Sequence, residues 1–215
     1  AEYLVLPNEF EFKDPTPYSV ATTEYSPKES RYKKQSQEIM ERRREEGRES
    51  NLESDFELSS YNNFKLSETG LNNRKGHELV YTDKFAVTDL IKTAGDSCYI
   101  LEVGRLITSQ VDIQEEEYER ITDVYVNYAK TYSYRIVIAV PEGYDVLGVE
   151  RLNRRVENEA GIFESTAKVD NGKLVITTTK IYDATFLRAA EWSKMTSFLD
   201  EAFDFYNSKV VFVHQ

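Results

Sequence analysis

Residues 163–182 read FESTAKVDNGKLVITTTKIY, and this stretch carries the clearest structural signal in the chain. Two runs rich in strand-forming residues, 163–169 and 173–182, flank the tripeptide Asp170-Asn171-Gly172. Asn-Gly is a preferred dipeptide of two-residue hairpin turns, because both central positions of that turn need a positive φ. The stretch therefore predicts a β-hairpin.

The same period of two runs through the sequence that precedes the hairpin. Apolar and aromatic side chains recur at every second position in four further stretches, 79–87 (interrupted by Asp83), 99–103, 124–128 and 132–140. Such alternation is typical of strands that bury one face. Short strands separated by turn-forming residues predict a mainly β chain of the α+β kind, built as an antiparallel β-sandwich.

A helical pattern follows the hairpin. Large apolar side chains recur at spacings of three and four, which places them on one face of a helix. They are Trp192, Met195, Phe198, Leu199, Ala202, Phe203 and Tyr206. Burying each large member stabilises a fold by roughly 1.5–3 kcal/mol before entropy is subtracted. The sequence thus predicts a C-terminal amphipathic helix that packs on the core, followed by a final strand at residues 210–213.

The first 60 residues differ from the rest of the chain. Ser26-Pro27-Lys28-Glu29 has the N-cap, proline and capping-box residues of a helix start, and Gly47 suits a helix end. Few sizeable apolar side chains lie between them, so we expect an exposed connector helix. The sequence therefore predicts two parts, a linking segment with one exposed helix at 1–60 and a β-sandwich accessory domain at 61–215.

Composition excludes several classes of partner. The 215 residues include 27 basic and 38 acidic side chains, which give a formal net charge of −11. Nucleic acids and anionic membranes need a basic surface, so we expect neither as the main partner. The longest aliphatic run, 136–140, is far shorter than the roughly 20 residues of a membrane span. The single cysteine excludes an internal disulfide and a multi-cysteine zinc site.

Candidate catalytic residues are few. Nucleophilic catalysis by cysteine needs a histidine within hydrogen-bond reach, and only Cys98, His77 and His214 are available. Cys98 lies in a strand pattern rather than at a helix N-terminus, where thiols are activated. We expect a small buried cysteine, two surface histidines and no catalytic residue. A hydrolase that uses Cys98 is the alternative.

No motif points to a metal or a cofactor. The densest acidic run consists of Asp112, Glu115, Glu116, Glu117 and Glu119. It lacks the alternating spacing and the glycine of a known calcium loop, so we expect a solvated loop, with calcium binding as the alternative. Gly-rich phosphate loops are not found in the sequence. We therefore predict no metal and no cofactor.

Tyrosine is frequent, with 15 residues in the chain. Exposed aromatic rings on a β-sandwich can stack on sugars or bind partner side chains, but tyrosine also packs well within sheets. Tyr125 lies opposite the apolar face of its predicted strand, and Tyr118 is near it in sequence. We single out Tyr118 and Tyr125 as a possible binding surface, with packing inside the fold as the alternative.

Several segments of the second part resemble a known family. They are Tyr99-Ile100-Leu101 with Gly104-Arg105-Leu106-Ile107, Ile138-Ala139-Val140-Pro141-Glu142-Gly143-Tyr144, Asn158-Glu159-Ala160-Gly161-Ile162-Phe163, and Trp192 with Phe198-Leu199-Asp200-Glu201-Ala202-Phe203-Asp204-Phe205. Together they resemble the uncharacterised C-terminal domain, a domain of unknown function, that follows a transglutaminase-like core in exported bacterial multidomain proteins. The resemblance covers roughly residues 61–215, and its motifs are packing and turn motifs.

The resemblance implies that this chain is the noncatalytic tail of a longer protein, with residues 1–60 joining it to the core. Such a core carries Cys, His and Asp in a papain-like arrangement, and no stretch here matches it. The implied partner is the transglutaminase-like core of the same parent chain, and the implied location is extracytoplasmic. Our first hypothesis is an accessory domain that positions the core or binds a partner surface. The alternative is a carbohydrate- or cell-wall-binding module that uses exposed tyrosines.

Overall fold

The structure, a computed structural model, describes the backbone of residues 2–5, 11–20, 31–69, 77–95 and 97–214. The chain divides into two compact units, Ala1–Asp89 and Leu90–Gln215. The boundary that we expected at residue 60 falls inside strand β3, Leu58–Thr69. Because β3 pairs with β4, His77–Val87, the residues just after position 60 belong to the N-terminal unit.

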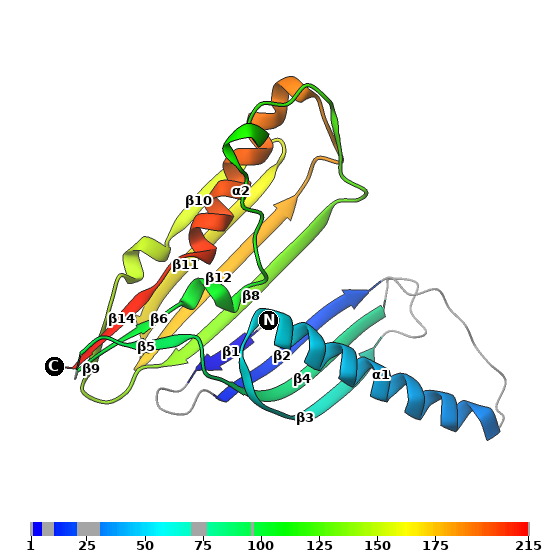
Figure 1. The fold of residues 1–215 in the computed structure, drawn as a ribbon, viewed down its shortest axis with the longest axis vertical. Coiled ribbons are helices and arrows are strands. Elements are labelled where there is room, and N and C mark those ends of the chain that lie inside the picture. The colour runs from blue at the N-terminus through cyan, green and yellow to red at the C-terminus, as the bar shows by residue number, and fades with distance from the viewer. Residues whose placement is uncertain (1, 6–10, 21–30, 70–76, 96, 215) are drawn as a thin grey trace. The chain divides into compact units, whose positions relative to one another are not determined.

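The N-terminal unit contains a small antiparallel sheet (Figure 1). Its three strands lie in the order β2-β4-β3, with β2 at Glu11–Val20. The described residues of the unit also contain a short strand β1, Glu2–Val5, and the long helix α1, Arg31–Asp55. Phe85 and Val87 of β4 are buried, as the alternation in that stretch predicts.

Helix α1 extends further than the sequence predicts. We expected it to end at Gly47, but it runs on past that residue. The predicted start at Ser26-Pro27 lies outside the described residues. Leu52 and Phe56 are buried beyond the glycine, and the Phe56 ring centroid lies 6.1 Å from that of Phe85. Burial of these side chains outweighs the cost of about 1 kcal/mol for a glycine inside a helix.

A buried ion pair ties α1 to the sheet of the same unit. Asp83 on β4 is 1% exposed, and Arg48 on α1 donates from Nε to its Oδ2 at 2.7 Å. The Tyr61 hydroxyl on β3 donates to Asp83 Oδ1 at 2.8 Å. Burial, together with the carboxylate that it contacts, raises the pKa of Tyr61 well above its ordinary value. The Asp83 charge is therefore fully matched by groups of the fold itself.

The larger sheet of the C-terminal unit contains the predicted hairpin. Its antiparallel strands in this unit lie in the order β8-β12-β11-β10. Their bounds are Lys130–Ala139 for β8, Arg154–Asn158 for β10, Gly161–Asp170 for β11 and Lys173–Tyr182 for β12. Asn171 and Gly172 turn between β11 and β12 with φ of 49° and 69°. The hairpin prediction is confirmed, because an Asn-Gly turn requires both of these positive angles.

A second antiparallel sheet has the order β5-β6-β14-β9. The bounds are Ile91–Thr93 for β5, Cys98–Leu101 for β6, Tyr144–Leu147 for β9 and Val210–His214 for β14. The last of these strands, β14, pairs with β6 on one side and with β9 on the other. The predicted final strand is confirmed, and it occupies the interior of its sheet.

Helix α2, Trp192–Tyr206, packs across β10 and β11 of the larger sheet (Figure 1). Its buried side chains are Met195, Thr196, Phe198, Leu199, Ala202 and Phe205. We expected Phe203 and Tyr206 on this face, but Phe205 is the residue that is fully buried, with its ring centroid 5.7 Å from that of Phe163. Phe205 follows Ala202 by three positions and Phe198 by seven, which keeps it on the same face.

The predicted fold class is confirmed. The chain is mainly β, with antiparallel sheets, a C-terminal amphipathic helix and a final strand. Neither helix in the described part of the chain is long and apolar enough to cross a membrane.

Two glycines of the C-terminal unit allow close approach of the backbone. A Cβ at Gly104 would lie 2.1 Å from the carbonyl oxygen of Phe205, and one at Gly161 would lie 2.2 Å from that of Ile181. Both distances are impossible for a real side chain, so only glycine fits. Asn158 adds to this packing, since its Nδ2 donates to the Lys194 carbonyl at the start of α2 at 2.9 Å. These residues belong to the segments that carry the family resemblance, which explains them as packing motifs.

Candidate functional site

A two-stranded ribbon lies at the end of the C-terminal unit where α2 begins. It consists of β7, Val124–Tyr125, and β13, Phe186–Leu187, which pair antiparallel. The N–H of Val126 donates to the Thr185 carbonyl at 2.9 Å, and the N–H of Ala189 donates to Asp123 Oδ1, also at 2.9 Å. One backbone bond and one bond to a side chain thus help to hold the ribbon, although each strand is only two residues long.

Large apolar side chains stand exposed on and beside this ribbon. We call them the aromatic patch, and they are Ile121, Tyr125, Tyr128 and Phe186. Ile121 is 98% exposed and Tyr125 is 76% exposed. The rings of Tyr125 and Phe186 pack on each other with centroids 4.9 Å apart and planes 49° apart. Exposed apolar side chains gathered in one region can mark an interaction site on a soluble domain.

Tyr118 lies in the adjoining loop and has a different partner. Its hydroxyl donates to Asp200 Oδ1 on α2 at 2.9 Å, and this bond raises the pKa of Tyr118. Nearby, Trp192 donates from Nε1 to the Glu117 carbonyl at 2.8 Å, and the Arg120 guanidinium lies 4.8 Å from the Trp192 ring centroid. The loop is thus fastened to the start of α2, which gives the patch a fixed support.

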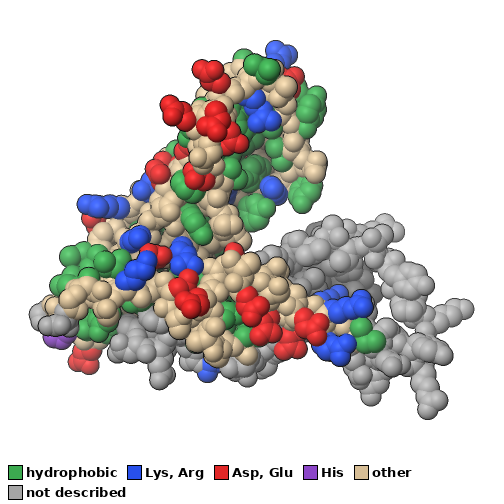
Figure 2. All heavy atoms as spheres, in the orientation of Figure 1, with side chains coloured by type: hydrophobic (Ala, Val, Ile, Leu, Met, Phe, Trp, Pro, Cys, Tyr) green, Lys and Arg blue, Asp and Glu red, His purple; other side chains and the backbone are tan. Residues whose placement is uncertain are grey.

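Acidic side chains are frequent in the segment that precedes the ribbon. The run that we expected to be a solvated loop, from Asp112 to Glu119, contains the short 3₁₀ helix η2, Glu115–Glu117, and its acidic side chains are exposed. Glu117 accepts from the N–H of Gln114 at 2.9 Å. In Figure 2 hydrophobic side chains lie along the right of the upper end of the molecule, and acidic ones along its left. Within the described residues, no three His, Cys, Asp or Glu side chains are grouped as a metal site would require.

The structure places the two tyrosines singled out from the sequence at the same end of the unit but with different partners. Tyr125 is exposed and packs on Phe186, whereas Tyr118 is bonded to α2. Sequence reasoning missed Ile121, Tyr128 and Phe186. We expected Tyr128 on the buried face of its strand, but the strand stops after Tyr125, so the alternation does not reach it. Ile121 stands alone among polar residues, a signal that was available in the sequence.

The cysteine and histidine candidates do not form a site in the second sheet. Cys98 on β6 is paired with Val213 on β14, so His214, the next residue of β14, points to the opposite face. The His214 ring instead lies edge-on against Tyr144, with centroids 5.0 Å apart. Cys98 is half-buried rather than fully buried as expected. The side chain of His77 lies outside those that the structure describes.

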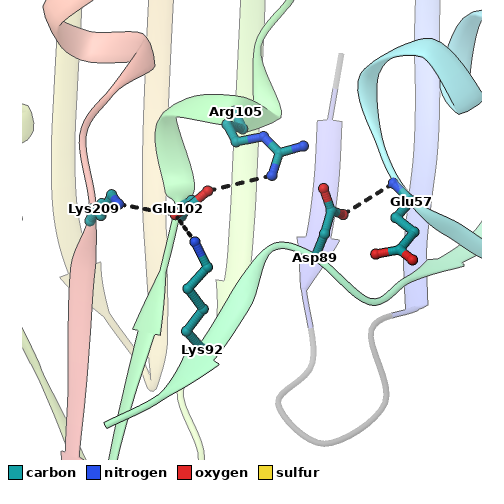
Figure 3. A network of polar contacts seen from close by, with 6 residues as sticks. All are labelled: Glu57, Asp89, Lys92, Glu102, Arg105 and Lys209. Atoms are coloured by element: carbon teal, nitrogen blue, oxygen red, sulfur yellow. Dashed lines mark hydrogen bonds and ion pairs between the residues drawn. The ribbon is translucent and has the colours of Figure 1, made fainter.

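Figure 3 shows a polar network that connects residues in or next to strands β5, β6 and β14 of the second sheet. Glu102 accepts from Lys92 at 2.7 Å and from Lys209 at 3.0 Å, and Arg105 lies 3.4 Å from its other oxygen. The hydrogen bond from Lys92 is the main reason why the pKa of Glu102 is lowered to about 2. Each charge of this network has a partner, so we interpret it as structural. The same figure shows Asp89 of the N-terminal unit, which accepts from the N–H of Glu57 at 3.1 Å.

The C-terminal unit is thus a mainly antiparallel β domain that exposes the aromatic patch on and beside the ribbon of β7 and β13. The chain belongs to the family described as a domain of unknown function with solved structure (DUF3858), which matches residues 99–212. The matched range starts in β6 and ends in β14, so it lies within the C-terminal unit. No curated protein matches the chain, and no solved structure does either.

Proposed function

We propose that this chain is a noncatalytic accessory domain that binds a partner protein through the aromatic patch. The observation that carries this proposal is the exposure of Ile121, Tyr125 and their neighbours on a ribbon held by backbone hydrogen bonds. Each Å² of apolar surface that a partner covers contributes roughly 25 cal/mol before the costs of association are subtracted. The patch thus has both the composition and the fixed geometry of an interaction surface.

The surroundings of the patch favour a protein with basic side chains. Aromatic residues are enriched at the energetic centres of protein interfaces, and charges around them direct the encounter. The segment from Asp112 to Asp123 carries exposed acidic side chains and a single basic one, Arg120. A partner with an apolar contact and a basic rim would complement this distribution.

The partner that we propose is the transglutaminase-like core of the same parent chain, in an extracytoplasmic compartment. The segments around Gly104, Asn158 and Gly161 that resemble the tail of such proteins support this choice. In this proposal the tail holds the core in position and carries no reacting group.

Site-specific crosslinking tests the proposal. A photoreactive phenylalanine analogue replaces Tyr125 in the producing cell, and Val169, which is also exposed and lies on β11, is the control position. We expect crosslinked peptides from a transglutaminase-like segment at position 125 and none at position 169. The same peptides at both positions, or peptides only from unrelated proteins, would contradict the proposal. Fractionation of the same cells checks the compartment.

A second candidate function is binding of carbohydrate or cell-wall material. The observation that favours it is the exposure of the Tyr125 ring beside Phe186, since sugar rings pack on exposed aromatic surfaces. A glycan array and a cell-wall pull-down with the native chain and with Tyr125→Ala would decide. Binding that the substitution abolishes supports this function. If no glycan binds, the accessory function alone is retained.

The noncatalytic part of the proposal has its own test. A nucleophilic thiol reacts with iodoacetamide far faster than an ordinary one at neutral pH, because the thiolate is the reacting form. We expect Cys98 to be alkylated at the slow rate of an unactivated thiol, since the pairing of β6 with β14 turns His214 away from it. Rapid labelling that denaturation abolishes would instead favour a cysteine hydrolase.

A further inference from the structure

Two lysines and three aromatic rings meet on one face of the larger sheet. Tyr132 of β8 is paired with Lys180 of β12, and Lys130 is paired with Tyr182, so all four side chains point to the same side. This is the side that α2 covers, because the Tyr182 ring lies edge-on against Phe198 with centroids 5.3 Å apart. We call this set the lysine–aromatic cluster.

The Tyr182 ring lies within reach of both ammonium groups. The Nζ atom of Lys130 is 4.9 Å from its centroid, and that of Lys180 is 5.1 Å from it. Lys130 also lies 5.7 Å from the Tyr132 ring, and Lys180 lies 5.9 Å from that of Phe198. These distances permit cation–π attraction, which is strongest when the cation is shielded from water.

The cluster holds two cations and no anion. Lys180 is only 7% exposed, and the one acceptor that the described residues give it is the neutral Oε1 of Gln110, at 2.7 Å. Neither Lys130 nor Lys180 forms an ion pair within the described part of the chain. Other lysines of the same unit do have carboxylate partners, as Lys92 and Lys209 have in Glu102.

The electrostatic state of the cluster follows from this imbalance. Burial and the nearby charge of Lys130 lower the pKa of Lys180 to about 8. Burial raises the pKa of Tyr182 to about 12, so its hydroxyl is neutral and supplies no counter-charge. A negative group placed beside the two lysines would remove the repulsion between them and would restore the pKa of Lys180.

We propose that Lys130 and Lys180 bind the carboxylate of an organic acid whose apolar body packs on Tyr132 and Tyr182. The two ammonium groups supply the charge that a carboxylate needs, and the rings supply the apolar wall. Tyr132 is 38% exposed and Lys130 is half-buried, so the ligand would enter from their side. The aromatic patch plays no part in this site, and the proposal is independent of the proposed function.

Benzoate is a suitable probe, since it joins a carboxylate to a flat apolar ring. Calorimetric titration of the full chain measures binding of benzoate, of benzamide, which lacks the charge, and of inorganic phosphate, which lacks the apolar body. We expect benzoate to bind and benzamide and phosphate to bind at least tenfold more weakly. If phosphate binds as tightly as benzoate, the proposed class of ligand is wrong. If neither benzoate nor phosphate binds at millimolar concentration, the proposed site is wrong.

Substitutions place the binding on the cluster. We expect Lys130→Met and Lys180→Met each to weaken benzoate binding about tenfold or more, because each removes one of two charges. Lys168→Met, which removes an exposed lysine on the other side of the hairpin, is the control and should change nothing. Unchanged affinity in Lys130→Met, whose side chain is partly exposed and should leave the fold intact, would overturn the proposal.

A spectroscopic readout separates binding from a structural effect. The ε-carbon resonance of Lys180, followed by NMR in isotope-labelled protein, reports its protonation. Saturating benzoate should move the midpoint of this titration to higher pH, and benzamide should leave it in place. A midpoint that benzoate does not move would show that the carboxylate lies elsewhere.

Discussion

The two units bury charge in opposite ways. Asp83 of the N-terminal unit lies between an arginine and a tyrosine that match it, whereas Lys180 of the C-terminal unit faces an amide, two rings and a second lysine. Removing one partner of a matched buried charge is strongly destabilising, but the intact pair needs no further partner. An unmatched one lowers stability for as long as it stays ionised, and such groups are concentrated at functional sites. The contrast therefore separates a structural pair from a candidate site.

The largest expected effect is the loss of the matched charge. Asp83→Asn leaves the Arg48 guanidinium and the Tyr61 hydroxyl without their carboxylate, and we expect about 3 kcal/mol of destabilisation. Hydrogen exchange of the Phe56 amide, which is bonded to the Leu52 carbonyl, reports on this unit. Glu46→Gln in the same unit removes the exposed partner of Arg42 and should cost less than about 1 kcal/mol. If both variants lose the same free energy of unfolding, burial of the Asp83 pair makes no difference to stability.

The unmatched charge should be visible in the pH dependence of stability. Because the pKa of Lys180 is lowered from 10.5 to about 8 in the folded state, the unfolded chain binds more protons between these values. Stability should therefore rise with pH in this window, by about 2 kcal/mol between neutrality and the onset of tyrosine ionisation. Lys130, Tyr132 and Tyr182 face the same group. Because the pKa of Tyr182 is raised from 10.0 to about 12, this tyrosine lowers stability as the pH rises above about 10.

Urea unfolding followed by fluorescence measures this, because the single tryptophan of the chain, Trp192, lies in α2 of the C-terminal unit. The native chain should gain stability relative to Lys180→Met as the pH rises. Lys168→Met should parallel the native chain. If the stability of the native chain and that of Lys180→Met change with pH in the same way, the charged form of Lys180 is not destabilised by burial.

At neutral pH the same substitution should stabilise. Lys180→Met keeps the volume of the side chain and removes the buried charge, so we expect a gain of about 1 kcal/mol. The gain is smaller than the pKa shift alone suggests, because Gln110 Oε1 loses its donor. The same fluorescence assay measures this change. If Lys180→Met instead destabilises the chain by more than about 1 kcal/mol, the cation–π contacts of Lys180 outweigh the cost of burying its charge.

The smallest effect belongs to Glu102, a matched charge near the surface. Its pKa is lowered to about 2, so its contribution is present above the ordinary value of 4.5 and is lost as the pH falls below it. Lys92 and Lys209 are largely exposed, which screens the pairs, so Glu102→Gln should cost about 0.5–1 kcal/mol at neutral pH. The variant should approach the native chain in stability near pH 3, and a constant difference would contradict the assignment.

Local signals in the sequence account for much of the fold. The Asp170-Asn171-Gly172 turn and the apolar spacing of α2 act over a few residues, so they are readable without the rest of the chain. The end of α1 could not be predicted from local sequence, because burial of Leu52 and Phe56 depends on contacts with residues that are distant in the chain. The division of the chain was missed for the same reason, since β3 belongs to the N-terminal unit only through its pairing with β4.

The candidate surface was only partly predictable. Tyr125 was found from the alternation of its strand, but its neighbour Phe186 comes from a segment far along the chain that pairs with it. The sequence also contains a signal for the lysine–aromatic cluster. Leu174, Ile176 and Thr178 alternate inward along β12, and the next inward position is Lys180. A lysine on a buried face is itself an indication of a site.

The interior position of β14 has a consequence for biosynthesis. Strand β9 and the β14 side of β6 find their hydrogen-bonding partner only in residues that the ribosome adds more than sixty positions after β9 is complete. Until then their edges are open, and open edges promote association with other nascent chains. Any truncation that removes β14 should therefore yield aggregates in the cell rather than a smaller folded product.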